Sequence, residues 1–280
     1  MNLNIIFKHE SRSAIKVAVL IVLALLWLIP VYALIVDGLK TTSGVLTTPV
    51  LVPAAFSFSA MRTVIIALAR PIENSLLYVL PVAFISTFVG ALAAYYFYKV
   101  TSFLNNTIFT IIAIATFVPY QITLVPLIRL VVSLGIFNST YGLIFAFLIF
   151  YLPTGALLMS IFIAVLPKTT MESARVDGAS DFTVFRRIVI PLTMPGMIST
   201  FIFVFIETWN NFFIPLVLIS SVDKRTVAVA LLSYTGGFGT LYNDSFAAAF
   251  IASLIPLVIF IFLGRYFVKG LMAFGSGAKG

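Results

Sequence analysis

Pro167 to Pro195 reads PKTTMESARVDGASDFTVFRRIVIPLTMP and lies between two long apolar segments. We call this stretch the polar loop. It holds four of the 17 basic residues and three of the nine acidic ones, in a chain where only 9% of residues are charged. This density of charge indicates that the polar loop lies in water. The apolar segments on either side of it decide the fold.

The rest of the chain is too apolar for a water-soluble protein. Hydrophobic residues make up 61% of its 280 residues, and the mean hydropathy is +1.16. Such a chain cannot hide its apolar surface in one soluble core, so we expect an integral membrane protein. The formal charge of +8 is explained by basic residues that gather on the cytoplasmic side of a membrane, and no nucleic-acid partner is expected.

Six apolar segments are each long enough to cross a bilayer as a helix, at about 1.5 Å per residue across roughly 30 Å of hydrocarbon. A signal peptide is the alternative for the first segment, but that segment is too long and lacks a clear cleavage site. The prediction is an all-α, polytopic membrane protein with a single transmembrane domain over residues 1–280. The expected spans are 15–36, 75–98, 108–130, 141–166, 196–220 and 246–268, followed by a C-terminal tail at 269–280.

Proline positions predict where the helices are interrupted. Pro30 should kink the first span. Pro71 is expected to separate a short interfacial helix at 61–69 from the second span. Pro119 and Pro126 predict a broken helix in the third span, because each removes a backbone donor.

Two short helices around a glycine are expected within the polar loop. Thr169 and Glu172 have the spacing of a capping box, which predicts a helix from about Thr170. This helix should end near Gly178, because glycine tolerates the left-handed conformation that closes a helix. The loop should therefore turn back on itself at this glycine.

The second helix of the polar loop should begin at a capping residue, either Ser180 or Asp181. Arg186 and Arg187 would give it a basic face beside an apolar one. Pro191 is expected to end or kink this helix. The apolar face would consist of Phe182, Phe185, Ile188 and Val189.

The spacing in the polar loop also resembles a known motif. The run Glu172-Ser173-Ala174, three residues, Gly178, nine residues and Ile188-Val189-Ile190-Pro191 is similar to the E-A-A, x3, G, x9, I-x-L-P motif of ABC importer permeases. Ser173 and Ile190 depart from it by small changes in volume. The resemblance implies coupling helices in the cytoplasm that dock into a separate ATPase subunit through residues 169–187. The residues it implies for this contact are Glu172, Ser173, Ala174, Asp177, Gly178, Arg186 and Pro191. An ordinary amphipathic loop with a solvated face is the alternative.

A second resemblance concerns the solute. The segment ETWNNFFIPL, from Glu207 to Leu216, resembles the W-N-x-[FY]-x-x-P-L pattern of carbohydrate-type permeases. With Asp177-Gly178-Ala179 and the glycine-rich tail, it makes the chain similar to the shorter six-span permease of maltose-type importers. The resemblance implies ATP-driven sugar or oligosaccharide import by alternating access. The implied partners are a homologous second permease, two cytosolic ATPase subunits or domains, an extracytoplasmic solute-binding protein and membrane lipid.

Two other functions stay open on the sequence. Within the same family the solute could be a polyol or a glycerol phosphate. A secondary transporter would show inverted repeats and paired broken helices, and no such symmetry is found in the sequence. The polar loop would also be left without a role in a secondary transporter.

The distribution of basic residues gives the orientation. Six spans place both termini on one side, with the polar loop. That side holds eleven lysines and arginines, and the other side holds six, which puts the polar loop and both termini in the cytoplasm of a cell-membrane protein. The eleven are Lys8, Arg12, Lys16, Lys99, Lys168, Arg175, Arg186, Arg187, Arg265, Lys269 and Lys279.

Polar side chains at membrane depth predict a solute path. Glu207 is the only carboxylate well inside a span, where an ionisable group needs a partner or water. Asn210 and Asn211 follow at i+3 and i+4 and share its stripe, and Trp209 offers an aromatic face. A polar clasp between helices is the alternative. The weaker candidates from other spans are Gln121 and Thr154.

Catalytic chemistry is not expected in this chain. It has a single histidine, His9, and no G-x-x-x-x-G-K-[ST] phosphate loop. It also has no cysteine, so it has neither a disulfide nor a thiolate site. We therefore expect a transport subunit that needs no metal or cofactor and leaves ATP hydrolysis to a partner.

Overall fold

The computed structural model describes residues 3–235 and 241–277. Over these residues the chain forms helices joined by turns, and no β-strand is present among them. The predicted all-α class is confirmed. The long helices are α1 (Leu3–Gly38), α3 (Ser59–Lys99), α6 (Thr140–Ala164), α9 (Ile190–Asn210) and α12 (Tyr242–Gly277).

Among the described residues, five helices are long and apolar enough to cross a membrane. A sixth span results if α4 (Phe103–Ala115) is taken together with η1 (Tyr120–Thr123) and α5 (Leu124–Ser133), which are bent by 95° from it. The count then reaches the expected six. The shorter elements are α2 (Thr42–Thr47), α7 (Lys168–Val176), α8 (Asp181–Val184), η2 (Phe185–Val189), α10 (Phe213–Leu218), η3 (Val222–Lys224), α11 (Val227–Ala230) and η4 (Leu231–Tyr234).

The prolines do not all act as predicted. The break at Pro119 is confirmed, because α4 ends at Ala115 and the chain resumes at Tyr120. Pro126 does not interrupt α5, since it lies in the first turn, where a backbone N–H has no partner in the helix. The predicted separation at Pro71 is wrong: α3 runs without a break through Pro71 and Pro81. A proline inside a helix removes one hydrogen bond, and packing within a long membrane helix can offset that loss.

The fifth span and the tail also differ from the expected boundaries. α9 ends at Asn210, and a separate short helix, α10, covers Phe213–Leu218. At the other end, α8, the π-helical turn η2 and α9 form one helix from Asp181 to Asn210. α12 continues to Gly277, so most of the expected tail is helical, while residues 278–280 lie outside the described residues.

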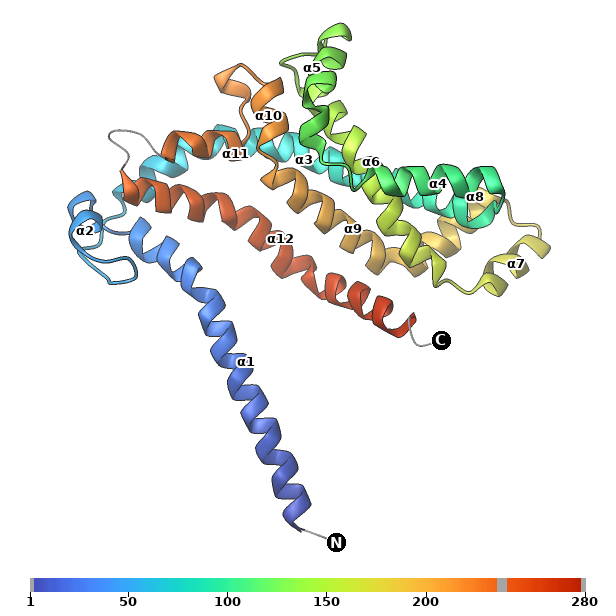
Figure 1. Ribbon diagram of the computed structural model, residues 1–280, viewed down its shortest axis with the longest axis horizontal. Coiled ribbons are helices and arrows are strands. Elements are labelled where there is room, and N and C mark those ends of the chain that lie inside the picture. The colour runs from blue at the N-terminus through green and yellow to red at the C-terminus, as the bar shows by residue number, and fades with distance from the viewer. Residues whose placement is uncertain (1–2, 236–240, 278–280) are drawn as a thin grey trace. The chain divides into compact units, whose positions relative to one another are not determined.

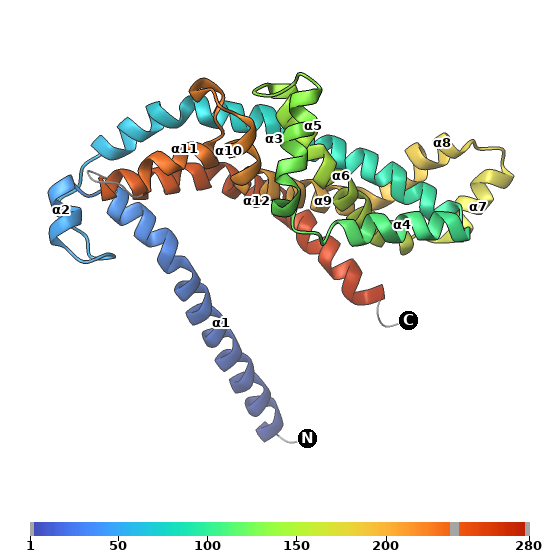
Figure 2. The same ribbon diagram turned by 45° about the horizontal axis from the view of Figure 1, so that its top comes forward.

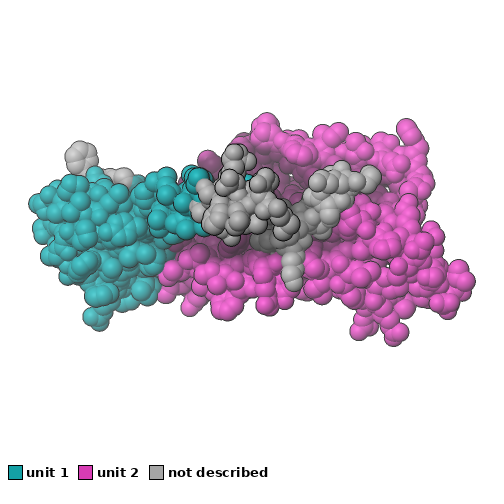
Figure 3. All heavy atoms as spheres, turned by 90° about the horizontal axis from the view of Figure 1, so that it is seen from below, with its two compact units in different colours: residues 1–67, 231–251 teal, residues 68–230, 252–280 magenta. Residues whose placement is uncertain are grey.

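The chain divides into two compact units, coloured separately in Figure 3. Unit 1 comprises residues 1–67 and 231–251, and unit 2 comprises residues 68–230 and 252–280. In unit 1, Asp37 and Lys40 form a fully buried ion pair with Nζ and Oδ1 2.5 Å apart, and Nζ also donates to the Pro49 carbonyl at 3.0 Å. This pair fixes the connection that follows α1.

Within unit 2, α6 packs against α9 and α4, as Figures 1 and 2 show from two directions. α6 also approaches α3 so closely that a Cβ added at Gly155 would lie 2.1 Å from the Ser86 carbonyl oxygen. A Cβ at Gly90 of α3 would lie 2.5 Å from the Gly155 carbonyl carbon. Small residues allow helix backbones to touch in this way inside a membrane. α3 and α6 therefore cross at backbone contact.

Candidate functional site

The first helix of the polar loop begins earlier than predicted. α7 starts at Lys168, and its N-cap residue is Pro167, which offers no side-chain hydrogen bond. The predicted capping box is therefore wrong, because Thr169 already lies inside the first turn. The Ser173 hydroxyl donates instead to the Thr169 carbonyl at 2.8 Å. Hydroxyl groups within a helix commonly bond back to the preceding turn in this manner.

The turn at Gly178 has the predicted form. Its φ angle is +86°, in the left-handed region. The Gly178 N–H donates to the Arg175 carbonyl and the Ala179 N–H donates to the Ala174 carbonyl, both at 3.0 Å. This pair of bonds is the Schellman arrangement, which satisfies the last carbonyls of α7. The prediction that Gly178 ends the first helix is confirmed.

The second helix of the polar loop begins at Ser180, whose hydroxyl accepts from the Thr183 N–H at 3.3 Å. Of the two predicted caps, Ser180 is the one used. Pro191 does not end this helix, because it occupies the first turn of α9 directly after η2. In a π turn the hydrogen bond spans five residues, as from the Ile190 N–H to the Phe185 carbonyl. The chain thereby accommodates the missing N–H of Pro191 without a break.

The polar loop exposes two apolar side chains, Val176, which the sequence did not single out, and Phe182, which was expected on the apolar face of the second helix. Val176 is 87% exposed and Phe182 is 64% exposed, one on each side of the Gly178 turn. Ala174 is half-buried and packs on a cluster of buried residues from α3, α6, α7 and the following helix. The other residues implied by the resemblance lie on the exposed side: Glu172, Ser173, Asp177, Gly178, Arg186 and Pro191.

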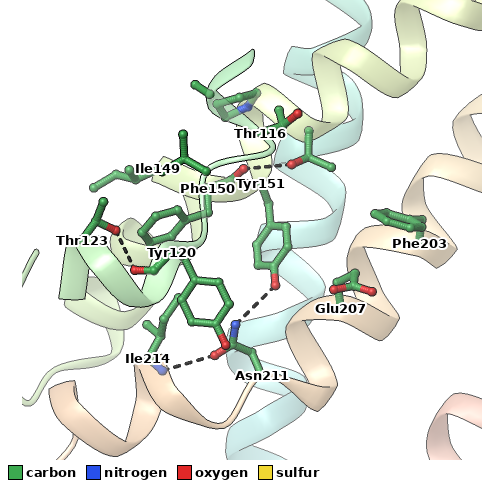
Figure 4. Close-up of a pocket in the computed structure, with 14 residues that line it drawn as sticks. Thr116, Tyr120, Thr123, Ile149, Phe150, Tyr151, Phe203, Glu207, Asn211 and Ile214 are labelled. Atoms are coloured by element: carbon green, nitrogen blue, oxygen red, sulfur yellow. Dashed lines mark hydrogen bonds between the residues drawn. The ribbon is translucent and has the colours of Figure 1, made fainter. Parts of the chain in front are cut away.

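A pocket of about 440 Å³ lies inside unit 2. In Figure 4, Phe203 and Glu207 of α9 stand on one side, opposite Tyr120 and Ile149, with Tyr151 between them. Its polar groups are hydroxyls, an amide and a single carboxylate, that of Glu207. The fourteen lining residues are Ala115, Thr116, Val118, Tyr120, Thr123, Ile149, Phe150, Tyr151, Pro153, Thr154, Phe203, Glu207, Asn211 and Ile214.

Asn211 connects this pocket to the end of α9. Its amide Nδ2 donates to the Tyr151 hydroxyl at 3.5 Å, and its Oδ1 accepts from the Ile214 N–H at 3.2 Å. The second bond satisfies a free donor at the start of α10, as side-chain caps do. Asn211 thus both lines the pocket and holds the break between α9 and α10.

The predicted path residues do not all reach the pocket. Glu207 and Asn211 line it. Asn210 and Gln121 are exposed and are not among the lining residues. Trp209 is only 3% exposed and lies with its ring stacked on a neighbouring phenylalanine of α9. The predicted stripe is only partly present: Asn211, which directly follows the end of α9, lines the pocket with Glu207, whereas Asn210, the last residue of the helix, does not.

Several lining residues were missed by sequence reasoning. Tyr120 follows the break at Pro119, and Tyr151 comes from the middle of α6. Thr154 had only been a weak candidate. The break at Pro119 was the one available signal, because non-helical backbone at membrane depth is tolerated where it lines a cavity. Nothing in the apolar run of α6 marked Tyr151.

A bundle of apolar helices with an internal polar pocket and a charged, folded loop is the architecture of a membrane transport protein. Residues 86–272 match the family described as binding-protein-dependent transport system inner membrane component. The chain belongs to this family. It is a multi-pass permease of an ABC importer, and ATP hydrolysis belongs to a separate ATPase subunit.

Related proteins support this assignment over nearly the whole chain. The glucose import system permease protein GlcU of Saccharolobus solfataricus is 50% identical, covering 96% of each chain. The alpha-glucoside transport system permease protein AglG of Rhizobium meliloti is 35% identical, over 74% of this chain and 56% of that one. A chain of a bacterial ABC transporter that imports the acidic polysaccharide alginate has the same fold, with a TM-score of 0.74 at 19% identity, covering 93% of this chain and 97% of that one.

Permeases of this family work with ATPase subunits and an extracytoplasmic binding protein. The polar loop is an exposed, folded surface, and the pocket is an internal space with hydrogen-bonding groups.

Proposed function

We propose that this permease imports a neutral sugar or oligosaccharide through the pocket around Glu207, driven by an ATPase that docks on the polar loop. The observation that carries the proposal is the chemistry of the pocket. It combines one carboxylate, one amide and several hydroxyls with aromatic rings. Carboxylate and amide oxygens accept hydrogen bonds from sugar hydroxyls, and aromatic rings pack on the apolar faces of sugar rings. The names of GlcU and AglG point to the same class of solute.

The charge of the pocket bears on the alternative solutes. Among its fourteen lining residues, all within the described part of the chain, none is lysine or arginine. A glycerol phosphate would need a cation or an array of backbone donors to offset its charge. A volume of about 440 Å³ also falls in the usual range for small-molecule sites, roughly 300–1,000 Å³. The pocket therefore favours an uncharged solute over an anionic one, and a polyol stays as the second candidate.

Removing the charge of Glu207 tests the solute path. In Glu207→Gln, we expect ATP-dependent sugar uptake to fall about tenfold, because a hydrogen bond to a charged group contributes about 1.5–3 kcal/mol. The measurement is uptake of labelled glucose or maltose into vesicles that contain the permease complex, the ATPase and the binding protein. Glu73→Gln is a matched control, since Glu73 is an exposed carboxylate of α3 whose side chain is 67% exposed. Normal uptake by Glu207→Gln would remove this carboxylate from the path.

A second, homologous permease is the proposed partner within the membrane. Only 6% of the apolar window of α1 is buried within the chain, compared with 44% for α3. Leu20, Trp27 and Leu28 are all more than half exposed. Lipid can cover part of this surface, and a second permease would cover more of it while enclosing the solute path. Both termini and the polar loop would lie in the cytoplasm, in line with the basic residues on that side.

The orientation can be tested by labelling, because the chain has no cysteine of its own. Val176→Cys, at a position that is 87% exposed, should react with a membrane-impermeant maleimide only from the cytoplasmic side. Leu46→Cys, in α2 and 66% exposed, should react only from the opposite side. Added ATPase should protect the first thiol and leave the second unchanged. Labelling of Val176→Cys from outside intact cells would contradict the proposed orientation.

A further inference from the structure

Three charged side chains meet where the polar loop joins the end of α3. Lys99, the last residue of α3, donates from Nζ to Oδ2 of Asp181 at the start of α8. Arg175 of α7 places its Nε 3.4 Å from Oδ1 of the same carboxylate. Arg175 also donates from Nη2 to the Tyr95 hydroxyl of α3 at 3.1 Å. One carboxylate thus connects both helices of the polar loop to one helix of the bundle.

These charges are only partly exposed to solvent. The exposed fractions of the side chains are 32% for Lys99, 34% for Arg175 and 52% for Asp181. The hydrogen bond to Tyr95 and the charges nearby raise the pKa of Arg175 above its ordinary value. Partial burial reduces screening by water and salt. The three side chains are less exposed than those of Arg70 and Glu73, an ion pair of α3 whose side chains are 66% and 67% exposed.

Further contacts hold the two helices of the polar loop against α3. The rings of Tyr95 and Phe185 lie 5.6 Å apart, and Met171 is only 3% exposed in the same buried cluster. The Lys168 ammonium also lies 5.6 Å from the centre of the Tyr98 ring, and the Tyr98 hydroxyl donates to the Leu166 carbonyl at 3.4 Å. These contacts hold each helix of the polar loop against the bundle.

The angle between α7 and α8 is a separate matter, because Gly178, at the turn between them, has no side chain to fix it. The ion pair between Arg175 and Asp181 spans that turn.

We propose that Lys99, Arg175 and Asp181 form a charged clasp that positions the polar loop on α3, so that displacement of the loop by a docked ATPase moves α3. The proposal rests on the polar loop being the docking site. These are positioning residues, since they act through the loop and not on the solute. Lys99 lies outside the E-A-A motif altogether, so the motif alone does not indicate this role.

The path from the clasp to the pocket is continuous within unit 2. Ser86 lies on α3, thirteen residues before Lys99, and touches Gly155 of α6 at backbone distance. Tyr151 and Thr154, which line the pocket, lie on α6 four residues and one residue before Gly155. Close-packed backbones shift together because there is no space between them to absorb a displacement. Movement of α3 is thereby passed to the residues that face the solute.

The number of solute molecules imported per ATP hydrolysed is the measurement that tests the clasp. It is made on the complete transporter in vesicles, with permeases, ATPase and binding protein present and labelled glucose as the solute. Lys99→Met and Asp181→Asn should each lower this ratio about threefold, the effect of losing one partly exposed ion pair. Lys99→Arg should retain it. Arg70→Met removes a matched but exposed cation of α3, 66% exposed beside Glu73, and should leave the ratio unchanged.

The double variant shows whether the residues act together. If the clasp is one unit, Lys99→Met combined with Asp181→Asn should be no worse than the poorer single variant. Losses that multiply would overturn the clasp, as would an unchanged ratio in the single variants. Tyr95→Phe keeps the ring that packs on Phe185 and removes one hydrogen-bond acceptor, and it should lower the ratio about twofold. It tests the proposal even if a charge variant fails to insert.

The outcomes separate this proposal from the proposed function. The ATPase should still copurify with Asp181→Asn, because the clasp does not itself dock. Loss of the ATPase from this variant would make Asp181 a docking contact and overturn its positioning role. If the unsubstituted permease retains no ATPase, the proposed function of the polar loop fails. If Gly178 variants uncouple transport while the clasp variants do not, the proposed function stands and the clasp falls.

Discussion

In the Gly178→Val permease, ATP-dependent sugar uptake is expected to fall to background while the protein still inserts into the membrane. The φ angle of +86° at this position lies in a region that costs an L-residue about 1–2 kcal/mol, and more for a β-branched side chain. A Cβ would meet no atom within 4 Å, so the substitution creates backbone strain without a clash. The chain can relieve that strain by opening the Schellman turn, which would move Val176 and Phe182 apart.

Two further substitutions make the Gly178 experiment specific. Gly178→Asn should retain most of the uptake, because asparagine adopts the left-handed conformation more readily than other residues with a Cβ. Gly135 follows α5, has a φ of +68° and is equally open, so Gly135→Val imposes the same kind of strain away from the polar loop. It should leave ATPase copurification unchanged. Wild-type uptake by Gly178→Val would mean that the geometry of this turn has no part in coupling.

In the Gly155→Leu permease, little folded protein is expected at all. Even the first added carbon would lie 2.1 Å from the Ser86 carbonyl oxygen, which is backbone and cannot rotate away. Gly155→Ala alone should cost about 3 kcal/mol, the upper part of the usual range for overpacking, and leucine should cost more. Because membrane proteins are also held together by small net free energies, we expect loss of the monodisperse protein after extraction into detergent.

The matched control for Gly155 is Gly264 in α12. A Cβ there would lie 3.4 Å from the nearest atom of the Phe260 ring, which is an ordinary contact with a side chain. Gly264→Ala should therefore keep or slightly raise the melting temperature, since alanine favours a helix over glycine by about 1 kcal/mol. Size-exclusion profiles and thermal melts of the purified complexes measure both variants. Stable Gly155→Leu protein would show that α3 and α6 do not cross at backbone contact.

Local features of the fold followed from local sequence. The apolar segments, the end of α7 at Gly178, the cap at Ser180 and the break at Pro119 each depend on residues within a few positions of one another. Hydropathy identifies a span because lipid offers no hydrogen bonds to the backbone or to polar side chains. A glycine or a proline changes the backbone conformation of the turn in which it lies, so its effect can be predicted from nearby residues. Two predictions from local rules were wrong: α3 runs continuously through Pro71, and the capping box at Thr169 did not form.

The sequence by itself determined that this chain is a helical membrane permease with a charged loop that carries a motif similar to E-A-A, because those properties lie in composition and short-range spacing. Only the tertiary structure decided which side chains meet. It buried Trp209, brought Tyr120 and Tyr151 to the pocket of Glu207 and joined Lys99 to Asp181 across 82 residues. Such contacts depend on where helices cross and where they end. The side-chain periodicity of a helix is the same whichever of its faces packs against a neighbour, so spacing along the chain cannot select which residues become contact partners.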